Sequence, residues 1–136
     1  MFTYILDTNV VSDSTKSRPN EGTMKWLNNT DPDVCCLSIL TIAELHRGVA
    51  LLTSRNALAK AQRIGLWVEQ VVGEYSNRLL DITPAVAYRW AYLPGRPTDF
   101  DSLIAATALT YDLTVVTRNV IEFEPFGVRL LNPFTP

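Results

Sequence analysis

Short apolar runs alternate with longer amphipathic segments along this chain of 136 residues. The short runs are rich in β-branched and aromatic residues and are bounded by turn residues, as expected of strands. They predict strands at 2–6, 34–37, 79–82, 113–116 and 127–131. In the longer segments apolar residues recur every three or four positions, which predicts helices near 21–29, 39–52, 55–75, 84–92 and 100–111. Residues 12–20 are predicted to form a polar loop.

Strands that alternate with helices are typical of a parallel sheet with helices on both faces. We therefore expect an α/β fold in three layers, α/β/α, around a central and mainly parallel sheet of five strands. The length fits a single domain that spans residues 1–136. Open sheets of this class bind ligands beyond the carboxyl ends of their strands. The residues that follow each strand are therefore the first candidates for a site.

The composition favours a compact globular protein, with 47% apolar and 19% charged residues. No apolar run reaches the ~20 residues of a membrane-spanning helix and the N-terminus lacks a basic signal region, so we expect a cytoplasmic protein with no membrane partner. Cys35 and Cys36 are adjacent in a predicted strand and should point to opposite faces, which predicts free, buried thiols. With a single histidine, the chain has no set of zinc ligands.

Three acidic residues stand out because each lies in an apolar frame. Asp7 closes the first predicted strand, and Glu44 and Asp101 lie within apolar helical segments. Burying an unpaired charge is costly, so acids in such frames are expected to converge on a cation. Each also fits an ordinary structural role. Glu44 with Thr41, and Asp101 with Thr98, have the spacing of a helix capping box, and Asp7 has the position of an Asx-turn.

Taken together, the three acids favour a divalent metal site, because all three are predicted on one rim of the sheet. Clustered carboxylates repel one another unless a cation neutralises them. Mg²⁺ and Mn²⁺ prefer oxygen ligands, and commonly use one or two carboxylates completed by water and phosphate. Such ions activate water for in-line displacement at phosphorus, which predicts phosphodiester hydrolysis. The net charge of −2 argues against a general basic nucleic-acid-binding protein but allows an enzyme with an acidic pocket.

Several segments strongly resemble the PIN domain, and in particular the VapC-type ribonuclease toxins of bacterial toxin–antitoxin pairs. The likeness extends over nearly the whole chain. Each motif is modest by itself, whereas their order and spacing together are highly specific. The segments are Leu6-Asp7-Thr8-Asn9-Val10-Val11-Ser12, Leu37-Ser38 with Thr41-x-x-Glu44-Leu45-x-x-Gly48, Asp101-x-Leu103-Ile104-Ala105-Ala106-Thr107-Ala108, Val116-Thr117-Arg118-Asn119-x-x-x-Phe123 and Leu130-Leu131-Asn132-Pro133-Phe134.

The resemblance implies an endoribonuclease that depends on Mg²⁺, for which Mn²⁺ may substitute, and that is the toxin of a type II toxin–antitoxin system. It also implies an RNA substrate, inhibition by a cognate antitoxin and, commonly, a homodimer. The family's three acids, which hold the metal, fall on Asp7, Glu44 and Asp101. Many relatives have a fourth acid where this chain has Asn119, which is expected to assist catalysis through a neutral oxygen. The choice of RNA over DNA rests on the resemblance alone.

Some alternatives remain open at this stage. Asp99 competes with Asp101, although the Leu-Ile-Ala-Ala register after Asp101 favours the latter. Two other functions also remain open. One is a catalytically impaired PIN-fold RNA-binding module, because Asn119 replaces an acid, and the other is an aspartyl-phosphate phosphohydrolase. The second chemistry needs another acid two residues after Asp7, where this chain has Asn9. Phosphate-binding candidates near the active rim are Lys16, Arg18, Arg47, Arg96 and Arg118, of which Arg118 directly follows the fourth strand.

Overall fold

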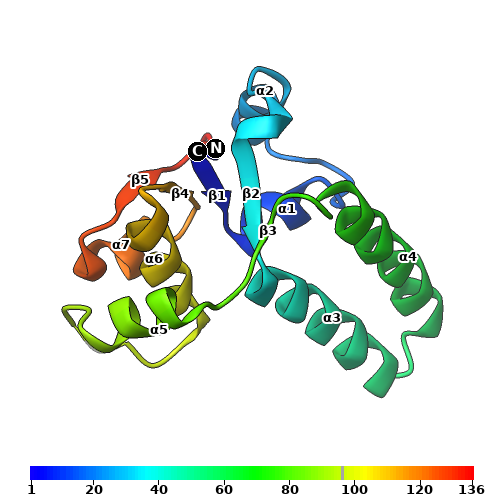
Figure 1. The fold of residues 1–136 in the computed structure, drawn as a ribbon. Helices are drawn as coiled ribbons and strands as arrows, with labels where there is room; N and C mark the ends of the chain where they lie inside the picture. Colours follow the sequence, from blue (N-terminus) through cyan, green and yellow to red (C-terminus); the bar gives the residue numbers. More distant parts are fainter. Residues whose placement is uncertain (96) are drawn as a thin grey trace.

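The computed structural model describes residues 1–95 and 97–136, so Arg96 lies outside the described residues. Its centre is a five-stranded sheet in which every neighbouring pair of strands is parallel, in the order β3-β2-β1-β4-β5 (Figure 1). The strands are β1 Tyr4–Leu6, β2 Cys35–Ser38, β3 Leu79–Leu80, β4 Thr114–Val116 and β5 Arg129–Leu131. The prediction of a parallel five-stranded sheet is confirmed. Each strand is a few residues long and lies within or at one residue from its predicted range.

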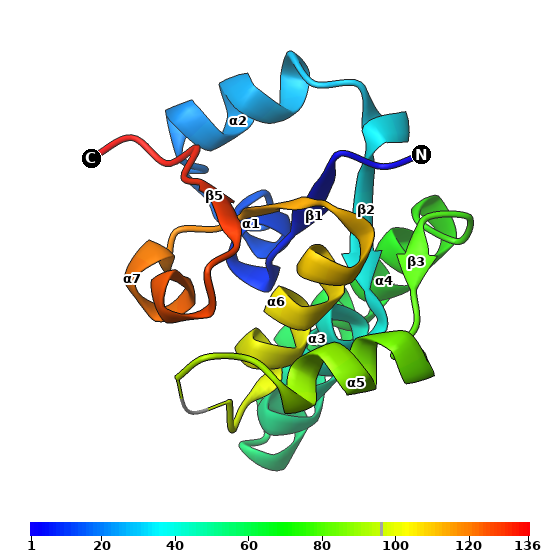
Figure 2. The same cartoon turned by 60° about the vertical axis from the view of Figure 1, so that its left-hand side comes forward.

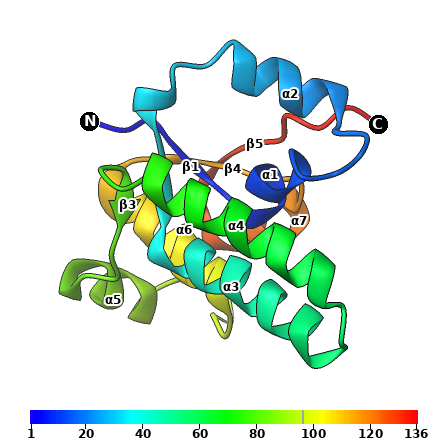
Figure 3. The same cartoon turned by 90° about the vertical axis from the view of Figure 1, so that its right-hand side faces the viewer.

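Helices cover both faces of the sheet, which confirms the three-layer α/β/α architecture (Figures 2 and 3). The apolar contacts of α1, α2, α3 and α4 are made with one face, and those of α5, α6 and α7 with the other. None of the described helices is long and apolar enough to cross a membrane. The helices are α1 Thr8–Asp13, α2 Glu21–Asn28, α3 Ile39–Ser54, α4 Leu58–Glu74, α5 Pro84–Ala91, α6 Phe100–Tyr111 and α7 Val120–Phe123.

The two adjacent cysteines illustrate how β2 separates the two halves of the core. Side chains alternate along a strand, so Cys35 packs in the cluster around Leu37 and Val68, and Cys36 in the cluster around Ile5 and Ile104. Both thiols are buried and free, as predicted. Burial raises the pKa of Cys35 to about 11 and that of Cys36 to about 12, so neither is a ready nucleophile at neutral pH.

Two short helices were not predicted from the sequence. Helix α1 has six residues and α7 has four, which is too short for a three- or four-residue apolar repeat to emerge. The longer predicted helices are all present. Helix α5 begins as expected, because the Thr83 side chain accepts a hydrogen bond from the Val86 amide at 3.3 Å and Pro84 occupies the first turn.

The strand order places a topological switch point between β1 and β4. From β1 the chain proceeds to β2 and β3 on one side, and later returns to β4 and β5 on the other. Crossovers that leave in opposite directions open a crevice beyond the carboxyl ends of these two strands. Asp7 directly follows β1 and Thr117 directly follows β4, so both lie at this crevice.

Candidate active site

Asp7 lies at the junction of β1 and α1 and is the N-cap of that helix. Its backbone is extended, with φ −73° and ψ 158°, and its Oδ1 accepts a hydrogen bond from the Thr8 amide at 2.8 Å. A capping carboxylate satisfies an amide that the first turn of the helix leaves free. Asp7 therefore does have a structural role, as the cap of α1 through the amide that follows it. The capping bond uses Oδ1, and Oδ2 faces Thr117 at the end of β4.

Thr117 connects the carboxyl ends of β1 and β4 through its buried hydroxyl. This hydroxyl donates to Asp7 Oδ2 at 2.8 Å and accepts from the Asn119 amide at 2.9 Å. The Asn9 side-chain amide also donates to Asp7 Oδ2, at 3.0 Å. These bonds favour the ionised carboxylate, but burial outweighs them and raises the pKa of Asp7 above its ordinary value. Asp7 is only 3% exposed, so its orientation is fixed before anything binds.

Glu44 extends from the second turn of α3 toward the same place. Helix α3 is capped by Ser38, whose hydroxyl accepts from the Leu40 amide at 3.0 Å. Thr41 therefore lies inside the helix, and the capping box considered for Thr41 and Glu44 is wrong. The Glu44 carboxylate instead accepts a hydrogen bond from the Thr8 hydroxyl at 3.0 Å. Its pKa is raised, chiefly by burial, and the nearby charge of Asp7 adds to the effect.

Asp101 lies in the first turn of α6 and is not the cap of that helix. The cap is Asp99, whose Oδ1 accepts from the Ser102 amide at 3.1 Å, so the capping box considered for Thr98 and Asp101 is also wrong. Asp99 is thereby accounted for, and Asp101 is the residue of the pair that lines the cleft. Burial, together with the charge of Asp7, raises the pKa of Asp101 to about 7.

Glu122 is an acid of this site that sequence reasoning missed. It lies in the first turn of α7, and its proximity is one of the causes of the raised pKa of Asp101. The charge of Glu122 raises the pKa of Asp7 as well. A signal was present in the sequence, because Glu122 follows Asn119 by three residues and a short helix there places both on one side. Helix α7 itself was not predicted.

All four residues expected from the sequence line one cleft of about 320 Å³. The structure thus brings together side chains that are up to 112 positions apart, from Asp7 to Asn119. Asn119 contributes its side chain at the start of α7, and its backbone amide is bonded to Thr117. The lining residues are Asp7, Thr8, Asn9, Ser12, Glu44, Asp101 and Asn119.

The electrostatics of the cleft fit a bound cation. Asp7, Glu44 and Asp101 all have raised pKa values, each with burial as the largest cause and a neighbouring carboxylate as a further one. None of the seven lining residues is basic. Among the described residues, no three His, Cys, Asp or Glu side chains form a group that could hold a metal ion by themselves. The cleft offers carboxylate, hydroxyl and amide oxygens, which are the kind of donor that hard divalent cations prefer.

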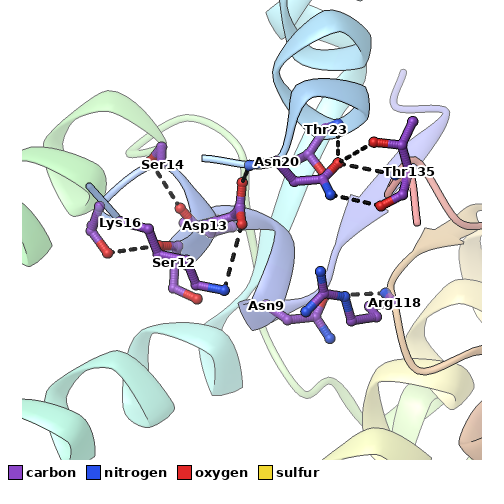
Figure 4. A network of polar contacts seen from close by, with 11 residues as sticks. Asn9, Ser12, Asp13, Ser14, Lys16, Asn20, Thr23, Arg118 and Thr135 are labelled. Carbon is purple, nitrogen blue, oxygen red and sulfur yellow. Dashed lines mark hydrogen bonds and ion pairs between the residues drawn. The ribbon is translucent and has the colours of Figure 1, made fainter. Parts of the chain in front are cut away.

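The phosphate-binding candidates are dispersed around this cleft. Arg118 is next to it, and its backbone amide donates to Asn9 Oδ1 at 3.2 Å (Figure 4). The Arg118 guanidinium stacks on the Phe134 ring, 4.1 Å from the ring centroid. Arg47 forms no ion pair with Glu44 in the part of the chain that the structure describes; it lines a neighbouring hollow beside Glu44 and Phe100. Lys16 and Arg18 line a separate hollow beyond α1.

The C-terminal segment is tied to the loop before α2 by one asparagine. The Asn20 side chain caps α2 at Thr23 and also bonds the backbone of Thr135, with Nδ2 donating to its carbonyl at 2.8 Å and Oδ1 accepting from its amide at 3.0 Å (Figure 4). The Asn20 amide in turn donates to Asp13 Oδ2 at 2.8 Å. This network holds Phe134 beside Arg118, and so connects the C-terminus with the rim of the cleft.

Comparison with known proteins gives a consistent result. Residues 4–123 match the family described as PIN domain. The chain is 31% identical to "Toxin FitB" of Neisseria gonorrhoeae, over 96% of this chain and 97% of that one. It is 28% identical to "VapC ribonuclease Y4jK" of Sinorhizobium fredii, over 97% and 98% of the two chains.

Solved structures agree with these sequence matches. A crystal structure of FitAcB from Neisseria gonorrhoeae superposes with a TM-score of 0.86 at 32% identity, over 96% of this chain and 98% of that one. A DNA-bound VapBC from Salmonella typhimurium superposes with a TM-score of 0.75 at 26% identity, over 98% and 99% of the two chains. The likeness thus extends over nearly the full length of the chain in each case.

Proposed function

The chain belongs to the PIN-domain family, and from this premise we propose that it is a Mg²⁺-dependent endoribonuclease, the toxin of a type II toxin–antitoxin system. The observation that carries the proposal is the convergence of Asp7, Glu44 and Asp101 on one cleft at the switch point of the sheet. Three carboxylates whose pKa values are raised chiefly by burial, with no basic residue in the lining, are costly to ionise unless a cation joins them. Phosphodiester hydrolysis is the reaction that a metal ion held by such carboxylates would promote.

Each residue has a distinct task in this proposal. Asp7, Glu44 and Asp101 would hold Mg²⁺, or Mn²⁺ in its place, with Glu122 and Asn119 at the edge of the same site. When bound, the ion supplies Lewis-acid activation of water and of the scissile phosphate. Thr117 and Asn9 keep the Asp7 carboxylate in one orientation through their hydrogen bonds. The Thr8 hydroxyl does the same for Glu44. Such supporting bonds typically contribute 10–100-fold to metal affinity or activity.

The proposal extends to the partners of the chain. FitAB and VapBC, by their names, are assemblies of two proteins, and this supports a cognate antitoxin as the partner of this chain. The curated name "VapC ribonuclease" supports RNA as the substrate. A homodimer and a cytoplasmic location remain predictions from the sequence, and both are consistent with an enzyme that acts on cellular RNA.

The two alternatives receive less support. An aspartyl-phosphate phosphohydrolase needs an acid two residues after its nucleophile, but Asn9 holds that position and is bonded to Asp7 and to the Arg118 amide. Asp7 also has hydrogen bonds on both oxygens, which suits a ligand better than a nucleophile. The case for a catalytically impaired RNA-binding module rested on Asn119 replacing an acid. Glu122 supplies an acid at this rim, so that case is weaker.

A cleavage assay with matched variants tests the proposal. We expect the wild-type protein to cut a labelled RNA in Mg²⁺ and to stop when the metal is chelated. Asp7→Asn and Asp101→Asn should abolish cleavage, since each removes one charge from the metal-binding set. Asp81→Asn removes the same charge from an exposed position outside the cleft and should cut like the wild type. If Asp101→Asn retained the wild-type rate, the role assigned to that residue would be wrong.

A further inference from the structure

A second hollow, lined by basic residues, lies beyond the C-terminal end of α1. Its volume is about 720 Å³, and its lining contains no acidic residue. Four of the chain's 12 lysines and arginines gather there, although the net charge is −2. We call it the basic hollow. It is lined by Thr15, Lys16, Ser17, Arg18, Lys60, Arg63 and Ile64.

Two separate elements supply these cations. Lys16 and Arg18 come from the loop between α1 and α2, and Lys60 and Arg63 come from the first two turns of α4. Residues three apart on a helix lie on one face, so Lys60 and Arg63 present their charges side by side. All four are exposed. The concentration of charge is therefore accessible to a ligand from solvent.

The loop that carries Lys16 and Arg18 has a defined conformation. Asp13, at 1% exposure, accepts the Asn20 amide at 2.8 Å and lies 3.6 Å from the Lys16 ammonium (Figure 4). The Thr15 hydroxyl donates to the Ser12 carbonyl at 2.6 Å. These contacts close the loop between the end of α1 and the start of α2, and they fix the side of the molecule on which its cations lie.

The basic hollow and the acidic cleft lie close together along the chain at α1. Thr8 and Ser12 line the cleft, and Thr15 lines the hollow. Helix α1 has six residues, which corresponds to about 9 Å at 1.5 Å per residue. One extended, negatively charged ligand can therefore reach both sites.

We propose that the basic hollow binds the phosphodiester backbone of the same RNA strand whose scissile bond lies in the acidic cleft. This inference rests on the proposed function. Carboxylates in the cleft repel the polyanionic substrate, and cations nearby offset that repulsion through contacts that do not depend on base sequence. A flexible backbone suits this hollow because it is wide and its donors are long, exposed side chains. The centre of a protein interface is typically apolar and depleted of charge, whereas Ile64 is the sole apolar residue among those that line this hollow.

A binding measurement with a matched control tests the inference. Lys60→Gln/Arg63→Gln removes two cations from the hollow, and Lys25→Gln/Arg55→Gln removes two from exposed positions elsewhere. Both pairs are made in the Asp7→Asn background, so that RNA is bound without being cut. Anisotropy of a fluorescent single-stranded RNA of roughly 20 nucleotides is then measured over a range of KCl concentrations.

We expect the Lys60→Gln/Arg63→Gln protein to bind roughly 10-fold more weakly at about 0.1 M salt than the control pair. The slope of log affinity against log salt should decrease by about 1.4, since each phosphate contact on a single strand contributes about 0.7. With Asp7 intact, the same pair should raise KM for the long RNA and leave cleavage of a dinucleotide, which spans only the cleft, unchanged.

Two outcomes would overturn the inference. One is equal affinity and equal salt slope for the two pairs of substitutions. The other is unchanged RNA binding with lost binding of the purified antitoxin, which would assign the hollow to a protein partner. Failure of the proposed function has a different signature, because the wild-type protein would then cut no RNA in Mg²⁺. The binding measurement decides the role of Lys60 and Arg63 in that case also.

Discussion

Gly22 offers an unusually sharp test of how the C-terminal segment packs. It is the second residue of α2 and lies under the chain at 133–135. A Cβ atom added to Gly22 would be 2.5 Å from the Pro133 carbonyl oxygen, 2.6 Å from the Thr135 Cγ2 and 2.9 Å from the Thr135 amide nitrogen. Two of these three atoms belong to the backbone. A methyl group at this position therefore requires the segment itself to move.

Gly22→Ala is expected to lower the free energy of unfolding, whereas the same change in an ordinary helix raises it. Replacing an exposed helical glycine by alanine usually stabilises by about 1 kcal/mol. Here the overlap adds a cost of about 1–3 kcal/mol, as for other overpacked sites. Displacing Thr135 also weakens its bonds with Asn20, each worth about 0.5–1.5 kcal/mol. We expect the free energy of unfolding to fall by about 1–3 kcal/mol.

Urea unfolding of Gly22→Ala and Gly73→Ala provides the measurement and its control. Gly73 lies in α4, and a Cβ added there meets no atom within 4 Å. Gly73→Ala should therefore be as stable as the wild type or more so, by up to about 1 kcal/mol. Equal stabilisation by both substitutions would refute the packing of the C-terminal segment on α2, and with it the position of Phe134 beside Arg118.

Three further predictions concern the acidic cleft. Thr117→Val removes the donor to Asp7 and should lower RNA cleavage by 10–100-fold, measured as kcat/KM, while a wild-type rate would refute the orienting role. Glu122→Gln should reduce cleavage more than Asn119→Ala does, because Glu122 is the charged member of this pair and acts on Asp101. The reverse order in the same assay would contradict this. Because the pKa of Asp101 rises from 3.8 to about 7 on folding, the native state retains a proton that the unfolded state has lost, so the stability of the metal-free protein falls as pH rises through that interval. Asp101→Asn removes this effect, and its gain in Tm over the wild type should be larger at about pH 8 than at about pH 5; an equal gain at both would show that Asp101 titrates normally.

The fold followed from the sequence where the elements are long or strongly apolar. Five apolar runs became the five strands, and the three- and four-residue apolar recurrence that predicted a helix near 55–75 corresponds to α4, in which Ala61, Val68 and Val71 are buried. Helix α1 was missed because its six residues are defined by the Asp7 cap and by burial of Val10 and Val11, and not by a repeat. Local capping and tertiary burial decide such a short element, and neither is visible in a periodic pattern.

The candidate site shows a similar division. Convergence of Asp7, Glu44 and Asp101 could be inferred because parallel strands end on one rim of a sheet. The two predicted capping boxes are wrong because other residues cap these helices. Ser38, three residues before Thr41, caps α3, and Asp99, one residue after Thr98, caps α6. Competition between neighbouring polar residues for one helix start depends on where the helix begins. That boundary is set by packing on the sheet, and the sequence does not specify it closely.

A calorimetric titration of Mn²⁺ into the metal-free protein decides most directly whether the acidic cleft holds a divalent cation. We predict saturable binding by the wild-type protein and its loss in Asp7→Asn, because Asp7 is the most buried of the three acids and its charge acts on both Glu44 and Asp101. Asp81→Asn should bind as the wild type does. The absence of Mn²⁺ binding by the wild type, or equal binding by Asp7→Asn, would contradict the assignment of this cleft as a metal-dependent nuclease site.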